Sequence, residues 1–192
     1  MDKHETCQWG TTSEIMLQYH NTEWGVPVHD DRKLFEYLIL DAFQAGLSWS
    51  TILNKRENFR KAFDHFDWKK IALYSESKEA ELLQDSGIIR NKLKVKAAIT
   101  NAQAFMKVIE EHGSFDAYIW RFVGNKPIVN QFKTMSDIPA VSPEAEVMSK
   151  DLKKRGFKFV GPTIIYAFMQ AAGMVNDHII NCKRHEEVKA LY

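Results

Sequence analysis

Apolar residues recur at helical spacing along most of the chain. The longest such stretch, residues 81–113, ends at a glycine and carries five small or apolar residues near the period of a helix: Leu93, Ala97, Ala98, Ala104 and Phe105. Five more stretches are predicted to be helices: 13–20, 30–46, 75–87, 142–156 and 163–173. Most begin at Ser or Asp, and four end at Gly, as capped helices do. Only "PIVNQF", residues 127–132, suggests a strand, so the sequence predicts an all-α protein.

The length and composition are those of an ordinary folded domain. With 192 residues the chain can bury a sizeable core, and we expect residues 1–192 to form a single unit. Hydrophobic residues make up 45% and charged residues 27%. No run of eighteen apolar residues and no signal-type leader occurs, so we expect no membrane span and a cytoplasmic location. No extended apolar stripe is left over, which favours a monomer.

The charge balance leaves room for a local basic patch only. A net charge of +1 argues against a wholly basic nucleic-acid binder. Residues 90–96 nevertheless carry four Lys or Arg without an acid, and residues 150–158 carry five against one Asp. A solvated helix face explains most such runs.

Glycines separate helical stretches at two places, in "DSGIIRNK" (85–92) and in "KRGFKFVGPT" (154–163). In the second, Gly156 and Gly161 flank an apolar turn, and Pro162 and Thr163 begin the next helix. Such a turn leaves backbone N–H groups unpaired at a helix start, which suits a phosphate oxygen. A plain connection between two helices is the simpler interpretation of the spacing alone.

Asp41 is the only charged residue in "YLILDAFQAGLSWSTILN", residues 37–54. It falls on the helix face of Leu34, Leu38 and Ala45, and a helix that is apolar nearly all round is buried. A buried carboxylate is costly without a partner. Backbone N–H groups or a core Arg would satisfy it, or it recognises a cationic or N–H-bearing ligand.

Aromatic residues are frequent in the same part of the chain, among them Trp9, Tyr19, Trp24 and Trp49. Most aromatic residues at such spacing belong to a core. A buried acid among several rings is also what a pocket for a flat nitrogenous base needs, because the rings stack on the base while the acid contacts its edge.

The two cysteines lie near opposite ends of the chain, at Cys7 and Cys182. His178 and Cys182 share one face if their segment is helical. With Cys7 and His20 they would form a closed, structural Cys2His2 zinc site that joins the two ends. Two inert buried thiols are the alternative, and His4 and His185 are rival ligands that the spacing leaves open. A disulfide would be unusual in a reducing compartment.

Several motifs together resemble a known family of DNA repair enzymes. "YHNTEWGVP", "DAFQAGLSW", "LNKRENFR", "SGIIRNKLKV" and "KKRGFKFVGPTIIYAFMQAAGMVNDH" are similar to the successive signature blocks of the 3-methyladenine DNA glycosylase I family. The resemblance covers nearly the whole chain from Cys7 to Cys182. It implies an all-α, helix-hairpin-helix DNA glycosylase fold with a structural Zn²⁺ held by Cys7, His20, His178 and Cys182.

The resemblance also implies where DNA binds. It assigns residues of about 150–173 to the helix-hairpin-helix and makes "GFKFVGPT" the turn that contacts the DNA backbone. The expected DNA-binding residues are Lys154, Arg155, Gly156, Lys158, Gly161 and Thr163. Such contacts position a protein on double-stranded DNA without reading its sequence.

The implied reaction is hydrolysis of the N-glycosidic bond of 3-methyladenine in alkylated DNA, which leaves an abasic site. The base is flipped out of the stack and, being cationic, is already a good leaving group. The resemblance assigns Asp41 as catalytic carboxylate and five residues as the base pocket: Trp9, Met16, Tyr19, Trp24 and Trp49. Related enzymes carry a catalytic Asp where this chain has Asn176, and we expect the Asp177 side chain to point elsewhere.

Two positions depart from the family pattern. The family usually has Glu at the position of Asp41 and Tyr at that of Met16, so rate and base preference are open. A DNA-lesion binding protein without turnover is therefore an alternative hypothesis. A third is a zinc-stapled helical scaffold with no role in nucleic-acid binding.

Overall fold

The computed structural model describes residues 6–192, and helices dominate this part of the chain. The α-helices are α1 (Glu14–Thr22), α2 (Asp31–Gln44), α3 (Trp49–Ala62), α4 (Trp68–Ile71), α5 (Glu76–Gln84), α6 (Lys92–His112), α7 (Phe115–Trp120), α8 (Pro143–Lys154), α9 (Pro162–Ala171) and α10 (Lys183–Lys189). Short 3₁₀ helices are η1 (Gln8–Thr11), η2 (Asp64–Phe66), η3 (Arg121–Val123) and η4 (Met135–Asp137). The prediction of a helical protein is confirmed. In residues 6–192, none of the helices has the length and apolar character needed to span a membrane.

Two short strands pair in parallel, β1 (Ile128–Val129) with β2 (Val175–Asn176). The first lies in the stretch predicted as a strand. The second follows directly after the stretch 163–173 predicted as a helix and was not predicted. The pairing fixes the segment after α7 beside the end of α9.

Capping side chains explain where most helices begin. A Ser, Asp or Asn side chain accepts a hydrogen bond from a first-turn N–H group at each of these N-caps: Ser13, Asp30, Ser48, Asp67, Ser75, Asn91, Ser114 and Ser142. The exceptions in the described part of the chain are α9, whose N-cap is Gly161, and α10, whose N-cap is Cys182, and neither has a side-chain cap. The first N–H groups of α9 are therefore left for another acceptor.

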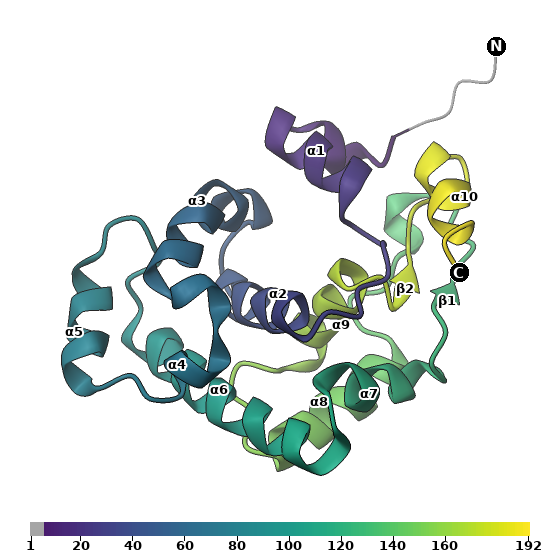
Figure 1. Ribbon diagram of the computed structural model, residues 1–192. Helices are drawn as coiled ribbons and strands as arrows, with labels where there is room; N and C mark the ends of the chain where they lie inside the picture. Colours follow the sequence, from purple (N-terminus) through teal and green to yellow (C-terminus); the bar gives the residue numbers. More distant parts are fainter. Residues whose placement is uncertain (1–5) are drawn as a thin grey trace.

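Helix α2 runs through the middle of the molecule, with other helices around it (Figure 1). All residues from Leu34 to Phe43 are buried, as an apolar helix requires. The main core packs these side chains against those of α6, α7, α8 and α9. Truncating one large side chain here would cost about 2–5 kcal/mol. The buried position of Asp41 thus follows from the packing of its whole helix.

A second, smaller core joins the two ends of the chain. It contains buried residues from the N-terminal segment, from α3 and from the segment after β2: Cys7, Met16, Tyr19, Trp24, Leu53, Ile179 and Cys182. The N-terminal segment and α10 lie side by side in Figure 1. Near them the chain crosses the end of α9, where a Cβ on Gly173 would lie 2.2 Å from the carbonyl carbon of Val26. Only glycine permits this crossing.

One detail of α6 differs from the expected pattern. Leu93, placed on the apolar face by the periodicity, is 70% exposed, whereas Lys94 is buried. The Lys94 ammonium donates hydrogen bonds to the carbonyl oxygens of Phe43 (2.8 Å) and Ala45 (2.6 Å) at the end of α2. Part of the 90–96 basic run therefore fastens α6 to α2 and is not a solvated face.

Candidate functional site

A cavity of about 410 Å³ lies where the second core meets α2, α3 and α9. Seven residues that the sequence analysis singled out line it: Trp9, Met16, Tyr19, Trp24, Asp41, Trp49 and Thr163. Eight lining residues were not predicted: Gln44, Met135, Ile138, Pro139, Ala140, Tyr166, Ala167 and Gln170. Those on α9 follow Thr163 at helical steps and were recognisable for that reason. The 135–140 wall has no periodicity, so nothing in the sequence marked it.

Asp41 meets the cavity without any polar partner. Its side chain is 3% exposed, and its Oδ2 atom is buried with no hydrogen-bond partner in the described part of the chain. Within residues 6–192, neither a backbone N–H group nor an Arg side chain donates a hydrogen bond to Asp41, although either would have satisfied it. Burial raises the pKa of this carboxyl well above its ordinary value, so the neutral form is favoured while the cavity holds no cation.

Aromatic rings form the wall opposite α9. The rings of Trp9 and Trp24 meet edge to face, with centroids 4.9 Å apart. Tyr19 lies between Trp9 (6.2 Å) and Trp49 (5.4 Å), tilted to both rings. The indole Nε1 of Trp49 is buried and makes no hydrogen bond within residues 6–192. Faces and edges of several rings thus surround one unpaired carboxyl.

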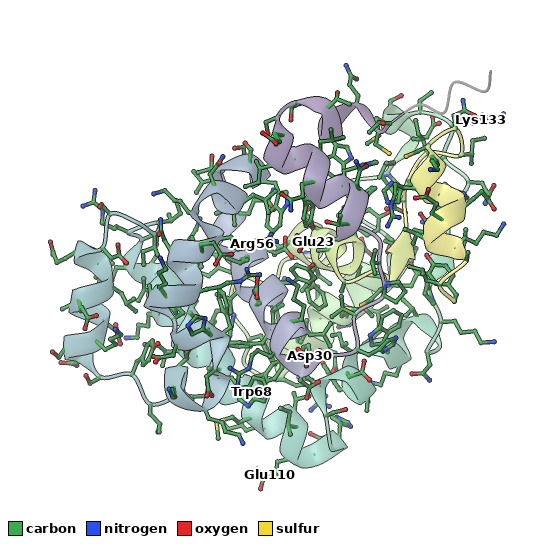
Figure 2. All side chains as sticks on the ribbon, turned by 45° about the horizontal axis from the view of Figure 1, so that its top comes forward. Glu23, Asp30, Arg56, Trp68, Glu110 and Lys133 are labelled. Atoms are coloured by element: carbon green, nitrogen blue, oxygen red, sulfur yellow. The ribbon has the colours of Figure 1, made fainter. Side chains whose placement is uncertain are left out.

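A charged layer lies directly behind this wall. Glu23 follows Tyr19 by one turn of α1, Tyr37 precedes Asp41 by one turn of α2, and Arg56 follows Trp49 by two turns of α3. Arg56 donates two hydrogen bonds of 2.8 Å to Glu23, and the Tyr37 hydroxyl donates a third of 3.0 Å. Figure 2 shows the Glu23 and Arg56 side chains together.

This layer holds three helices in register. Burial alone would raise the pKa of Glu23, but the hydrogen bonds and positive charge of Arg56 outweigh it and lower that pKa. Buried Asp41 and half-buried Glu23 therefore differ in charge, because only Glu23 has a cation beside it. The pair fixes α1 to α3 and so sets the spacing between Tyr19 and Trp49.

Four further side chains converge at the junction of the chain ends. Cys7, His20, His178 and Cys182 are buried, and one ligand atom from each lies within 4.8 Å of all the others. Sulfur–nitrogen distances are 3.5 Å from Cys182 to His20, 3.7 Å from Cys7 to His178 and 3.8 Å from Cys182 to His178. Tetrahedral zinc at usual bond lengths would separate such atoms by about 3.6 Å. The two sulfurs are free thiols and form no disulfide.

Hydrogen bonds outside the cluster leave the correct ring nitrogens available. The Nδ1 of His20 lies 2.8 Å from the Asn21 side-chain oxygen, and the Nε2 of His178 lies 3.0 Å from the Trp24 carbonyl. Each contact takes an N–H donor, so the other nitrogen offers a lone pair to a metal, as ligating histidines require. The pKa of Cys182 is lowered, chiefly by its hydrogen bond with Cys7.

Of the two rival ligands, His185 does not join the cluster. His185 contacts the Asn130 carbonyl (2.9 Å) and Glu186 (3.1 Å), and His4 lies outside the described residues. The chain between His178 and Cys182 is a turn and not a helix. The turn, and not a shared helix face, therefore brings the His178 and Cys182 side chains together.

Helices α8 and α9 are joined by a tight turn, residues 155–161. Gly156 has φ +94°, and the side chain of Asn101 in α6 bonds both backbone groups of Lys158, at 2.7 and 3.0 Å. The N–H groups of Gly161 and Thr163 make no hydrogen bond within the described chain. A Cβ on Gly161 would meet no atom within 4 Å. The turn is rigid and open on one side.

The basic residues around this turn are not equivalent. Lys154 and Lys158 are exposed. Arg155 is engaged within the protein, where it donates to Glu111 at 2.6 Å and to Asp151 at 2.9 Å. Its guanidinium fastens α8 to α6. The geometry thus removes the support for the expected contact of Arg155 with DNA.

Asn176 and Asp177 both have structural partners. The Asn176 amide donates to the His185 carbonyl (2.9 Å) and accepts from the His178 N–H (3.3 Å). The Asp177 side chain accepts hydrogen bonds from Tyr166 and Gln170, which line the cavity. Asp177 itself is not among the residues that line the cavity, which agrees with the expectation that its side chain points elsewhere.

Fold and site together define a helical protein with an aromatic, acid-bearing pocket beside a possible metal centre, and comparison with known proteins gives the family. A profile described as methyladenine glycosylase matches residues 9–185. The chain is 47% identical over 178 residues to DNA-3-methyladenine glycosylase 1 of Escherichia coli (strain K12), covering 93% of this chain and 95% of that protein. It is 44% identical over 176 residues to DNA-3-methyladenine glycosylase of Haemophilus influenzae, covering 92% and 95%. This chain belongs to the methyladenine glycosylase family.

Solved structures agree with this assignment. The structure of 3-methyladenine DNA glycosylase I from Staphylococcus aureus matches with a TM-score of 0.90 at 36% identity, over 94% of this chain and 96% of that one. A variant of 3-methyladenine DNA glycosylase I solved in complex with 3-methyladenine also matches with a TM-score of 0.90 at 36% identity, over 93% and 96%. The resemblance inferred from the sequence is confirmed.

Proposed function

We propose that this protein hydrolyses the N-glycosidic bond of 3-methyladenine in double-stranded DNA, as a monomer in the cytoplasm, and leaves an abasic site. The observation that carries the proposal is Asp41, a buried carboxyl without a partner in a cavity lined by aromatic rings. Such a group is costly in the free protein. A cationic, flipped-out base would offset that cost, whereas neutral adenine would not.

The chemistry needed from the protein is modest. A cationic base leaves readily, so the enzyme has to flip it, hold it and favour its charged form. The faces of Trp49 and Tyr19 stack on the base, and Trp9 and Trp24 close the wall. When the cation enters, Asp41 loses its proton and becomes its counter-charge. Asn176 supplies no carboxylate, because its amide is bound to backbone groups.

The turn between α8 and α9 would hold the DNA backbone beside the cavity. The unpaired N–H groups of Gly161 and Thr163 suit a phosphate oxygen, and Lys154 and Lys158 add positive charge. Thr163 also lines the cavity, so a phosphate bound here places its nucleotide at the entrance. Arg155 is left out of this surface because Glu111 and Asp151 hold it.

A structural zinc ion would occupy the Cys7, His20, His178 and Cys182 cluster. The ligand separations and the two fixed imidazole nitrogens support it. Four protein ligands leave no open position, so the ion would join the chain ends and take no part in catalysis. The ring of Trp24 packs edge-on against His178 at 4.6 Å, which ties the pocket wall to the ligands.

Base release from methylated DNA tests the proposal directly. Wild-type protein should release 3-methyladenine, measured by chromatography, and Asp41→Asn should slow release at least about 100-fold because the counter-charge is lost. Asp41→Glu, which keeps the charge, should retain release. Equal rates for wild type and Asp41→Asn would contradict the assigned role.

A non-catalytic DNA-lesion binding protein is the second candidate, motivated by Asp41 and Met16 in place of the usual Glu and Tyr. It predicts salt-sensitive binding to duplex with an abasic site and no release of base by the wild type. Running the binding measurement beside the release assay separates the two functions. Absence of DNA binding even at low salt would leave only the zinc-stapled scaffold.

A further inference from the structure

Two cavity-lining residues are held from behind by one buried carboxylate. Asp177 is 1% exposed and accepts hydrogen bonds from the Tyr166 hydroxyl (2.5 Å) and the Gln170 amide nitrogen (2.8 Å) through the same oxygen. Its other oxygen accepts from the side-chain amide of Asn130 at 2.7 Å. Three donors thus surround Asp177, and two of them belong to residues on the cavity side of α9.

This arrangement fixes which way the Gln170 amide faces. An ionised carboxylate only accepts hydrogen bonds, so Gln170 must present its NH₂ group to Asp177 and turn its Oε1 atom away. The Oε1 atom makes no hydrogen bond within the described chain, yet it is not among the buried unpaired atoms. It is therefore open to the cavity that Gln170 lines.

Gln170 lies at the end of the α9 wall away from the 155–161 turn. Thr163 and Gln170 are seven residues, about two helical turns, apart on one face, and Thr163 is exposed beside the turn proposed to hold phosphate. A nucleotide that enters past Thr163 places its base deepest. The edge of the base, and not the sugar, would therefore meet Gln170.

We propose that Gln170, oriented by Asp177, is a specificity residue that accepts a hydrogen bond from the exocyclic amino group of a methylated adenine and disfavours methylated guanine. This inference rests on the proposed function. Adenine presents an amino donor at the edge where guanine presents the O6 acceptor. Asp41 and Gln170 both offer oxygen atoms, so an adenine is paired where a guanine would face acceptor against acceptor.

The buried, unpaired indole N–H of Trp49 does not cancel this preference. The Nε1 atom of Trp49 lies in the plane of a ring whose face is proposed to stack on the base. An in-plane N–H group then points past the base and not at its edge. The Tyr166 hydroxyl donates its hydrogen bond to Asp177 and is therefore not available to the base.

A competition between two bases in one DNA sample tests the proposal. DNA methylated at N3 of both purines is incubated with each protein, and the initial rates of 3-methyladenine and 3-methylguanine release are expressed as a ratio. Gln170→Met, which keeps the volume but removes the amide, should lower the adenine-to-guanine ratio about tenfold. Because both rates come from the same molecules, partial misfolding cancels.

Asp177→Asn tests the positioning step separately. An amide at this position can bond Gln170 in either orientation, so Gln170 can turn its NH₂ group to the cavity, and the ratio should again fall. Gln103→Met is the matched control, since Gln103 bonds only the Ala72 carbonyl on the far side of α6 (3.0 Å) and should leave the ratio unchanged.

Each outcome decides one question. If wild type releases 3-methyladenine and Gln170→Met lowers both rates equally, the specificity role is overturned and the proposed function stands. If Gln170→Met lowers the ratio but Asp177→Asn does not, the orienting role of Asp177 is overturned. If wild type releases neither base, the proposed function fails and this inference with it.

Discussion

Replacing Asp41 with Asn should make the free protein more stable, although it removes the charge proposed to hold the base. In the folded state burial raises the pKa of Asp41 well above its ordinary value of about 4. The folded chain therefore binds this proton more tightly than the unfolded chain does. At neutral pH the unfolded state gains by ionising Asp41, and the folded state is penalised relative to it. Asn does not titrate and escapes that penalty.

The size of the effect depends on pH in a defined way. When folding raises the pKa of an acid, the folded state keeps its full stability below the unfolded pKa. As the pH rises toward the folded pKa, the acid ionises in the unfolded state first, and the folded state loses stability relative to it. The two proteins should differ little in this contribution near pH 4. Above that, the advantage of Asp41→Asn should grow by about 1.4 kcal/mol per pH unit until the folded pKa is passed. For a chain of this size each kcal/mol shifts the melting temperature by about 2–4 °C.

Thermal melts at half-unit steps from pH 4 to pH 8 measure this difference. Glu110→Gln is the control, because Glu110 is exposed on α6 and points away from the molecule (Figure 2). It should show no comparable growth of the gap with pH. A destabilised Asp41→Asn, or a gap that does not change with pH, would show that Asp41 has a partner in the folded protein and would refute the reasoning.

Three more outcomes follow from the structure. Metal analysis should find one zinc per wild-type chain. Removing zinc with a chelator, or making Cys182→Ser, should lower the melting temperature by about 10 °C or more. An unchanged melting temperature and no bound metal would contradict the zinc site. Gly161→Ala should leave the melting temperature unchanged, because the φ of Gly161 is −62° and no atom lies where the added Cβ would stand. It should weaken duplex binding about tenfold by crowding the bound phosphate. Undiminished binding would exclude a phosphate contact at Gly161. Arg56→Met should cost about 2 kcal/mol and weaken 3-methyladenine binding, measured by the intrinsic tryptophan fluorescence of the protein. Arg60→Met, which breaks the pair with Glu36 away from the pocket, should cost stability alone. Equal loss of binding in both variants would argue against a positioning role for Arg56.

Helices were predictable because their signals are local. Caps such as Ser13, Asp30 and Ser142 and the stops at Gly113 and Gly156 lie next to the segments they delimit. The exposure of Leu93 and the burial of Lys94 were not predictable from the sequence. The carbonyl groups that make burial of Lys94 favourable lie 51 and 49 residues away in the sequence.

The chemistry of the site was predictable from the sequence, but the backbone path that brings its residues together was predictable only in part. Cys7, His20, His178 and Cys182 do lie together, as the family resemblance implied, whereas spacing alone had left His4 and His185 open. A helix would have placed His178 and Cys182 on one face, but the chain forms a turn there, and the turn brings the two side chains together equally well. The support that Asp177 gives to the cavity wall was not predictable, because its partners, Tyr166 and Gln170, lie on another element and no local rule connects them.

The junction of the chain ends has a consequence for biosynthesis. Trp9, Tyr19 and Trp24 leave the ribosome well before their partners around Cys182 are made. The aromatic wall can therefore assemble only after the segment around Cys182 has emerged. A product of translation interrupted between the 155–161 turn and Cys182 would carry the turn proposed to hold DNA without a finished pocket.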